Sequence, residues 1–311
     1  MLSVLMIVLP IFALILAGWG ARRSGVLGPH ATGELNRFVV WLALPALLFD
    51  IVANAHWHDI WQPAFVATFA GGTAIVFVVT LALRLRSARH LADVAVDVLN
   101  AAYANTGFIG FPLLLSVFGP AAAAPTLIAA ILTVCVLFGA ALVLVEISLQ
   151  AEAHGVCVAA KVLTALARNP LIVAPAAGAL FLGFGLRVPV PAESFLKLLS
   201  GAASPCALVA LGLFLAEKRP DQAHTARATA LLVALKLIAH PLATWGLAVY
   251  VFRLPALLTH SAVLLAALPT GTGPFMVAEF YQREANITAR AILISTIASL
   301  ATITLYLSVA L

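Results

Sequence analysis

The sequence predicts an all-α polytopic membrane protein, with ten transmembrane helices arranged as two inverted five-helix repeats. Three observations predict this class. Hydrophobic residues make up 63% of the 311 positions and charged residues only 9%, with a mean hydropathy of +1.11. A soluble domain carries about 25% charged residues. Basic residues also gather between long apolar runs, and prolines and glycines recur at similar spacing in both halves of the chain.

Ten apolar runs follow one another along the chain, and each is long enough for a transmembrane helix of about 20 residues. We expect helices over 2–21, 35–54, 61–84, 94–118, 122–146, 162–185, 193–216, 226–251, 256–281 and 287–310. The polar stretch 151–161 is predicted to be a cytoplasmic connector. It joins a first five-helix repeat, 1–150, to a second, 162–311.

The basic residues predict the orientation of these helices. If the N-terminus lies outside, thirteen Lys and Arg residues fall at inner loops, and only Arg187, Lys197 and Arg253 fall at outer ones. Cytoplasmic loops of membrane proteins carry such an excess. We therefore expect both termini outside. The same excess accounts for the basic isoelectric point, so we expect no nucleic-acid partner.

Matching motifs in the two halves predict the repeat. The spacing P-x7-G-x-G occurs in the first run and again in the sixth, 165 residues later. Pro45 in the second run matches Pro205 in the seventh at an offset of 160, and Thr106 in the fourth matches Thr270 in the ninth at 164. Because five is odd, the second copy must cross the membrane upside down. Inverted repeats with interrupted helices are typical of secondary transporters.

The fourth and ninth runs are each interrupted near the middle, from Asn105 to Pro112 and from Pro269 to Pro274. Proline is favoured in the first turn of a helix, so we expect Pro112 and Pro274 to begin half-helices. A helix start presents unpaired N–H groups and about half a positive charge, and two such starts would form an anion site. The alternative is a pair of packing kinks. The candidate substrate-binding residues of the two crossovers are Asn105, Thr106, Gly107, Pro112, Pro269, Thr270, Gly271, Thr272 and Pro274.

The stretches "ANTGFIGFP" and "ALPTGTGPFMVAEFY" resemble the crossover motifs of the auxin efflux carrier family, which includes plant auxin exporters and bacterial carriers of malonate, malate and related acids. The resemblance extends over the whole chain and includes "LNRFVVWLALPALLF" and "SGAASPCALVALGLFLA". It implies a bacterial-type carrier of the inner membrane. The first, second, sixth and seventh helices would form a homodimeric scaffold, and the others would move as an elevator. Plant members have Pro at Ala104 and Gln-Gly-Ile-Val at 270–273, so the pocket chemistry need not match that of auxin carriers.

Three further polar residues are candidates. Lys236 lies about 13 Å inside its run, and His240 follows one helical turn later. A charge inside the membrane suggests a functional role, so we predict a coupling or pocket charge for Lys236 and His240; the alternatives are a lysine that snorkels to the surface and a histidine that satisfies a carbonyl. Asp50, near the outer end of the second run, either lines the pocket, as the resemblance suggests, or is an interfacial carboxylate.

The predicted function is secondary transport of a small organic carboxylate, such as malonate, malate or an auxin-like acid, by alternating access. No phosphate-binding loop or hydrolase motif is present, so we expect neither an ATP-driven pump nor an enzyme, and neither a cofactor nor a metal. The alternatives are a sodium-coupled carrier of the bile-acid type and a membrane sensor that binds its ligand without moving it. The expected partners are the carboxylate, membrane lipid and a second copy of the chain.

Overall fold

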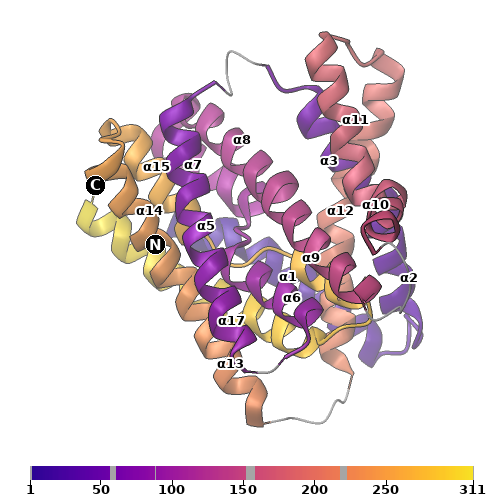
Figure 1. The fold of residues 1–311 in the computed structure, drawn as a ribbon. Helices are drawn as coiled ribbons and strands as arrows, with labels where there is room; N and C mark the ends of the chain where they lie inside the picture. Colours follow the sequence, from indigo (N-terminus) through magenta and orange to yellow (C-terminus); the bar gives the residue numbers. More distant parts are fainter. Residues whose placement is uncertain (1, 57–60, 88, 152–157, 218–222, 311) are drawn as a thin grey trace.

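The computed structural model describes residues 2–56, 61–87, 89–151, 158–217 and 223–310, and these residues form a bundle of α-helices (Figure 1). Over the described residues there is no β-strand, apart from one isolated bridge between Ala104 and Thr270. Six of the described helical segments are long and apolar enough to cross a membrane. One of them, Thr106–Gln150, spans 45 residues and covers the second part of the predicted run 94–118 and the whole of 122–146. The class is therefore confirmed, and the number of ten crossings stays a prediction.

The first half of the chain forms, in order, α1 (Leu2–Arg23), α2 (Ala31–Phe38), η1 (Val39–Ala43), α3 (Leu44–Ala53), α5 (Pro63–Leu85), α6 (Leu91–Ala102), η2 (Thr106–Gly110), α7 (Phe111–Phe118), η3 (Gly119–Ala122), α8 (Ala123–Ile131), η4 (Leu132–Leu137) and α9 (Phe138–Ala151). The second half forms α10 (Val158–Arg168), α11 (Pro170–Phe184), α12 (Val190–Ala216), α13 (Ala223–Ala234), η5 (Leu235–Ala239), α14 (His240–Gly246), η6 (Leu247–Val251), α15 (Ala256–Ala267), α16 (Gly273–Phe280) and α17 (Ala285–Ala310).

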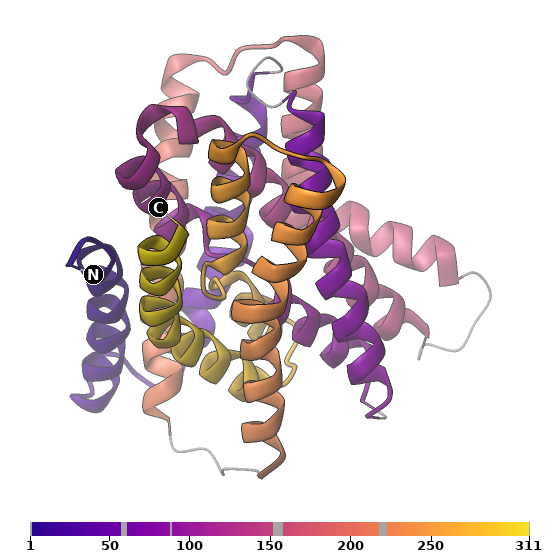
Figure 2. The ribbon, with the colours of Figure 1, turned by 90° about the vertical axis from the view of Figure 1, so that its left-hand side faces the viewer.

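The sixth predicted helix, 162–185, is wrong as a single element. Helix α10 begins at Val158, inside the predicted connector 151–161, of which residues 152–157 lie outside the described part of the chain. Helix α10 ends at Arg168, and Asn169 caps α11 by accepting a hydrogen bond from the Leu171 N–H at 3.0 Å. An asparagine cap followed by proline is a strong helix start, so α11 begins anew while α10 projects from the bundle (Figure 2).

Three π-helical turns lie just before prolines. The turns η1, η2 and η5 each end two residues before Pro45, Pro112 and Pro241 respectively. In a regular α-helix the proline ring collides with the carbonyl four residues earlier and removes one hydrogen bond. In each case that carbonyl belongs to the wider π-turn, which relieves the collision without ending the helix.

Helices from the first half of the chain pack against helices from the second half. Helix α1 packs along α12, α11 packs along α3, and α3 in turn contacts α12. The α1–α12 contact brings backbones together, because a Cβ added to Gly18 would lie 2.1 Å from the Val209 carbonyl oxygen. On the other side of the bundle, α5 contacts both α6 and α14. This arrangement places the interrupted segments between α6 and η2, and between α15 and α16, inside the protein.

Ion pairs fix one end of α6. The Asp97 carboxylate accepts a hydrogen bond from Arg84 Nε at 2.8 Å and lies 3.5 Å from an Arg89 nitrogen. Asp93 accepts two hydrogen bonds from Arg283, which follows α16. Since Asp97 is only 2% exposed, its pairing with arginine offsets the cost of burying the charge. Helix α6 is thereby joined to α5 and to the segment after α16.

Candidate functional site: a cavity at the crossing of two interrupted helices

Two extended segments cross between interrupted helices. Helix α6 ends at Ala102 and α15 at Ala267, and the chain after each runs extended past the other. The Asn105 N–H donates to the Pro269 carbonyl at 2.9 Å, and the Gly271 N–H donates to the Tyr103 carbonyl at 3.1 Å. The pairing is antiparallel. It satisfies backbone groups that the helix breaks would otherwise leave unpaired inside a membrane protein.

The two half-helices after the crossing start differently. Helix α16 begins at Gly273 with Pro274 in its first turn, as predicted. The start predicted at Pro112 is wrong, because helical structure already resumes at Thr106. The Asn105 side-chain oxygen accepts from the Phe108 N–H at 3.3 Å. Asparagine is a strong helix cap, so the helix begins directly after Asn105, and Pro112 lies inside it beyond the π-turn.

Polar side chains donate hydrogen bonds to the last carbonyls of α6 and α15, the two helices that end at the crossing. The Thr270 hydroxyl donates to the Asn100 carbonyl of α6 at 2.7 Å, and the Thr270 N–H donates to the Ser295 hydroxyl at 3.1 Å. Lys236 Nζ donates to the Ala266 carbonyl of α15 at 2.6 Å. Carbonyls in the last turn of a helix have no intrahelical partner, and a positive charge is favourable at that end.

Lys236 also begins a short chain of polar contacts. Its Nζ lies 3.1 Å from His240 Nδ1, and His240 Nε2 lies 3.1 Å from the Thr73 hydroxyl of α5. Lys236 and His240 are fully buried. No described carboxylate is within ion-pair distance of Lys236. Lys236 therefore does not snorkel to the surface; it contacts the end of α15 from inside the bundle.

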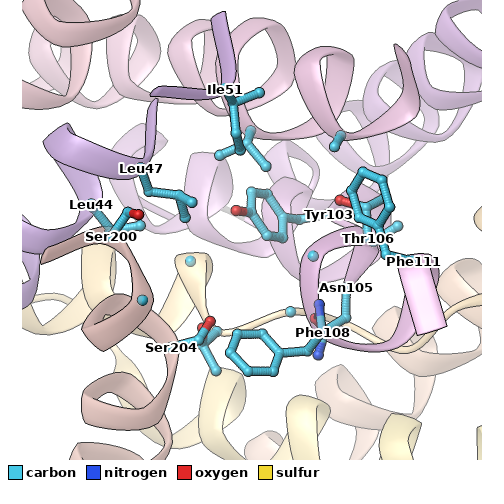
Figure 3. Close-up of a pocket in the computed structure, with 18 residues that line it drawn as sticks. Leu44, Leu47, Ile51, Tyr103, Asn105, Thr106, Phe108, Phe111, Ser200 and Ser204 are labelled. Atoms are coloured by element: carbon cyan, nitrogen blue, oxygen red, sulfur yellow. Dashed lines mark hydrogen bonds between the residues drawn. The ribbon is translucent and has the colours of Figure 1, made fainter. Parts of the chain in front are cut away.

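A cavity of about 230 Å³ lies at the crossing (Figure 3). Five of the predicted residues line it: Asn105, Thr106, Gly107, Gly271 and Thr272. The other predicted residues do not: Pro112, Pro269, Thr270, Pro274, Asp50, Lys236 and His240. Asp50 instead accepts a hydrogen bond from Asn54 Nδ2 at 2.7 Å, at the end of α3. The structure thus separates residues that face the cavity from residues that support the crossing.

Sequence reasoning missed the opposite wall of the cavity. Helix α3 contributes Leu44, Leu47 and Ile51, and α12 contributes Ser200 and Ser204. The two serines are one helical turn apart and therefore share a face, and Ser204 stands directly before Pro205, the counterpart of Pro45. That spacing could have indicated them. Tyr103, which also lines the cavity, was missed because it precedes the predicted interruption.

The cavity is lined by dipoles rather than by charges, since none of its described lining residues is Asp, Glu, Lys, Arg or His. The Asn105 amide oxygen is committed to the Phe108 N–H, which leaves the Asn105 NH₂ group as a donor. The Thr106 hydroxyl is buried without a hydrogen-bond partner. The start of α16 lies beside them at Gly273. Unpaired donors and a helix start suit an acceptor-rich ligand such as a carboxylate.

No group of three or more His, Cys, Asp or Glu residues in the described part of the chain is arranged to hold a metal ion.

With its strongly apolar helices and a polar cavity at a helix crossing, the chain belongs by class among membrane proteins that handle small solutes. It matches the model of the family described as membrane transport proteins over residues 3–307.

Three relatives extend this result. A protein of Rhizobium meliloti (strain 1021) named "Putative malonate transporter" is 32% identical over 301 residues, which cover 96% of this chain and 93% of the relative. An "Uncharacterized transporter" of Methanothermobacter thermautotrophicus is 27% identical over 301 residues, 96% of each chain. A "Probable auxin efflux carrier component 5c" of Oryza sativa subsp. japonica is 30% identical over 149 residues, 46% of this chain and 40% of the relative. The chain belongs to the membrane transport protein family that includes the auxin efflux carriers.

Proposed function

We propose that this protein is a secondary active transporter of small organic carboxylates, and that the cavity at the crossing is its substrate site. The observation that carries the proposal is the set of uncharged donors around this cavity. Asn105 offers its NH₂ group next to the start of α16, and the Thr106 hydroxyl is buried in the cavity wall without a partner. Such a site can stabilise an anion and still release it, because no fixed countercharge holds it.

The size of the cavity supports a small substrate. Sites for drug-sized ligands occupy about 300–1,000 Å³, and this cavity measures about 230 Å³. Malonate is the first candidate, because it is small and because the name of the Rhizobium meliloti relative refers to it. Malate and aromatic acids of the auxin type are the next candidates.

We further propose ten transmembrane helices in two inverted repeats, 1–150 and 162–311. Three observations support this topology: the crossing is antiparallel, α1 pairs with α12 as α11 pairs with α3, and the free ends of α1 and α17 lie toward the same end of the bundle (Figure 2). In this topology both termini lie outside the bacterial inner membrane.

We propose elevator-type alternating access for the transport step. One cavity wall comes from α3 and α12, and the other comes from the crossing and α8. If the crossing slides past α3 and α12, the site passes from one face of the membrane to the other. The first, second, sixth and seventh transmembrane helices would then form the fixed scaffold and the homodimer contact. Lys236 and His240 remain candidates for a coupling role.

Transport in proteoliposomes tests the proposal. Purified protein should exchange or accumulate radiolabelled malonate or malate, and a comparison of sodium with proton gradients identifies the coupling. Asn105→Leu and Thr106→Val should each lower uptake at least tenfold, because each removes a donor to a charged ligand. Thr302→Val, away from the cavity, serves as the matched control. Normal uptake by both cavity variants would refute the site, and binding without flux would indicate a sensor.

A further inference from the structure

We propose that Tyr103 is the specificity-determining residue of the cavity: its ring limits the length of the substrate, and its hydroxyl binds a carboxylate oxygen. The proposal rests on the proposed transport function and adds to it a residue that selects among acids. It begins from the position of Tyr103, which is the residue at the end of α6 where the extended segment starts. Its backbone carbonyl is held by the Gly271 N–H, so the crossing itself fixes its Cα.

The Tyr103 ring packs directly against Gly271 and Gly273 of the Gly-Thr-Gly sequence at 271–273. A Cβ added to Gly271 would lie 2.8 Å from Tyr103 Cε1, and one added to Gly273 would lie 2.8 Å from Tyr103 Cζ. Both distances are shorter than a van der Waals contact, so a side chain at either position would displace the ring. Phe138 of α9 packs against the ring with centroids 5.7 Å apart. The ring is therefore held rigidly, as a specificity residue requires.

The Tyr103 hydroxyl has a free hydrogen-bonding capacity directed into the cavity. The residue is only 7% exposed, and no described residue hydrogen-bonds its hydroxyl. Buried tyrosines usually find a partner for the O–H group. In Figure 3 the ring stands in the middle of the cavity, and its hydroxyl points toward the wall that carries Leu47 and Ser200. The missing partner is thus expected in the cavity, where the substrate binds.

The residues that line the cavity contain a second unpaired hydroxyl. Thr106 Oγ1 is buried, lacks a partner and belongs to the same cavity wall. The cavity lining therefore offers the Tyr103 hydroxyl and the NH₂ group of Asn105 as donors, and none of its described residues is charged. Because Figure 3 shows the Tyr103 hydroxyl pointing away from Asn105, this combination suits a short acid with a carboxylate at each end, such as a three- or four-carbon dicarboxylate.

The ring also explains the size limit. Tyr103 stands in the middle of the lining residues. Replacing it by a residue with a smaller side chain would therefore add the volume of the ring to the cavity. A longer or aromatic acid could then occupy the space of the ring, whereas wild-type protein excludes it. In a hydrophobic pocket, one extra or missing methylene of the ligand changes the preference by about 10–200-fold.

Ligand binding to the purified full-length protein tests this inference, with malonate and phenylacetate as the two probes. Tyr103→Phe keeps the ring and removes the hydroxyl, and we expect malonate affinity to fall about tenfold or more. Tyr103→Leu should lose malonate affinity and gain phenylacetate affinity. Tyr250→Phe, at a tyrosine that is 69% exposed, is the matched control and should bind as wild type does.

The outcomes separate the two proposals. If wild-type protein binds neither probe nor any other small carboxylate, the transport proposal fails and this inference fails with it. If wild-type protein binds malonate and Tyr103→Phe binds it equally well, the Tyr103 inference alone is overturned. Since Tyr103→Phe preserves the packing on Gly271 and Gly273, it should melt within a few degrees of wild type, and its result stands even if Tyr103→Leu does not fold.

Discussion

Polar side chains at the crossing divide into two groups by what they contact. Thr270 and Lys236 donate to backbone carbonyls at the ends of α6 and α15. Asn105 and Thr106 instead line the cavity, and the Thr106 hydroxyl has no hydrogen-bond partner. Substitution of Thr270 or Lys236 should therefore lower the stability of the protein. Substitution of Asn105 or Thr106 should instead lower its affinity for the substrate.

Lys236→Met provides the test at the residue scale. The variant keeps the length of the side chain but leaves the buried Ala266 carbonyl unpaired, which costs about 1–3 kcal/mol. We expect a lower melting temperature in detergent, with substrate affinity reduced far less than in Asn105→Leu. Lys197→Met is the control, because Lys197 pairs with Glu193 at an exposed site. Full stability combined with lost binding would instead make Lys236 a pocket charge.

At the scale of the element, capping residues decide where helices begin. Asn105 starts the helix after the crossing and Asn169 starts α11. Asn169 has a second contact, since its Nδ2 donates to the Tyr281 hydroxyl at 2.9 Å, and Tyr281 donates to Glu146 at 2.6 Å. The start of α11 is thereby joined to the segment after α16 and to α9.

Asn169→Ala tests this element. Loss of an asparagine cap costs about 0.5–2 kcal/mol, and loss of the Tyr281 contact should add to it. Combining Asn169→Ala with Tyr281→Phe gives a double-mutant cycle, and we expect the two effects to be less than additive because they remove one shared hydrogen bond. Melting curves of the four proteins measure the coupling. Strict additivity would show that the Asn169–Tyr281 contact contributes nothing to stability.

At the scale of the whole molecule, the prediction concerns orientation in the membrane. Arg86 follows α5, whereas Arg187 lies in the α11–α12 connection and Arg253 in the η6–α15 connection. Figures 1 and 2 show these two connections at the end of the bundle opposite to the end of α5. With both termini outside, Arg187→Cys and Arg253→Cys should react with a membrane-impermeant maleimide in intact cells. Arg86→Cys should react only after the membrane is opened. The parent protein for labelling replaces Cys135, Cys157 and Cys206 by alanine, and the reverse labelling pattern would invert the topology.

The sequence by itself determined the class of protein, the positions of most helices and the place of the two interruptions. These features depend on local composition: apolar length predicts a helix, and clustered proline and glycine indicate that it is interrupted nearby. Asn105, Thr106, Gly107, Gly271 and Thr272 could be predicted as cavity residues for the same reason, because they lie within the predicted interruptions.

Only the tertiary structure decided which polar residues face the cavity and which support the backbone. Thr270 and Thr106 occupy matching positions in the two halves, yet one caps Asn100 and the other remains unpaired in the cavity. Ser204 and Tyr103 became visible as lining residues only when α12 and the crossing were placed together. The physical reason is that a carbonyl freed by a helix break takes the nearest donor in space, and the sequence does not encode that distance locally.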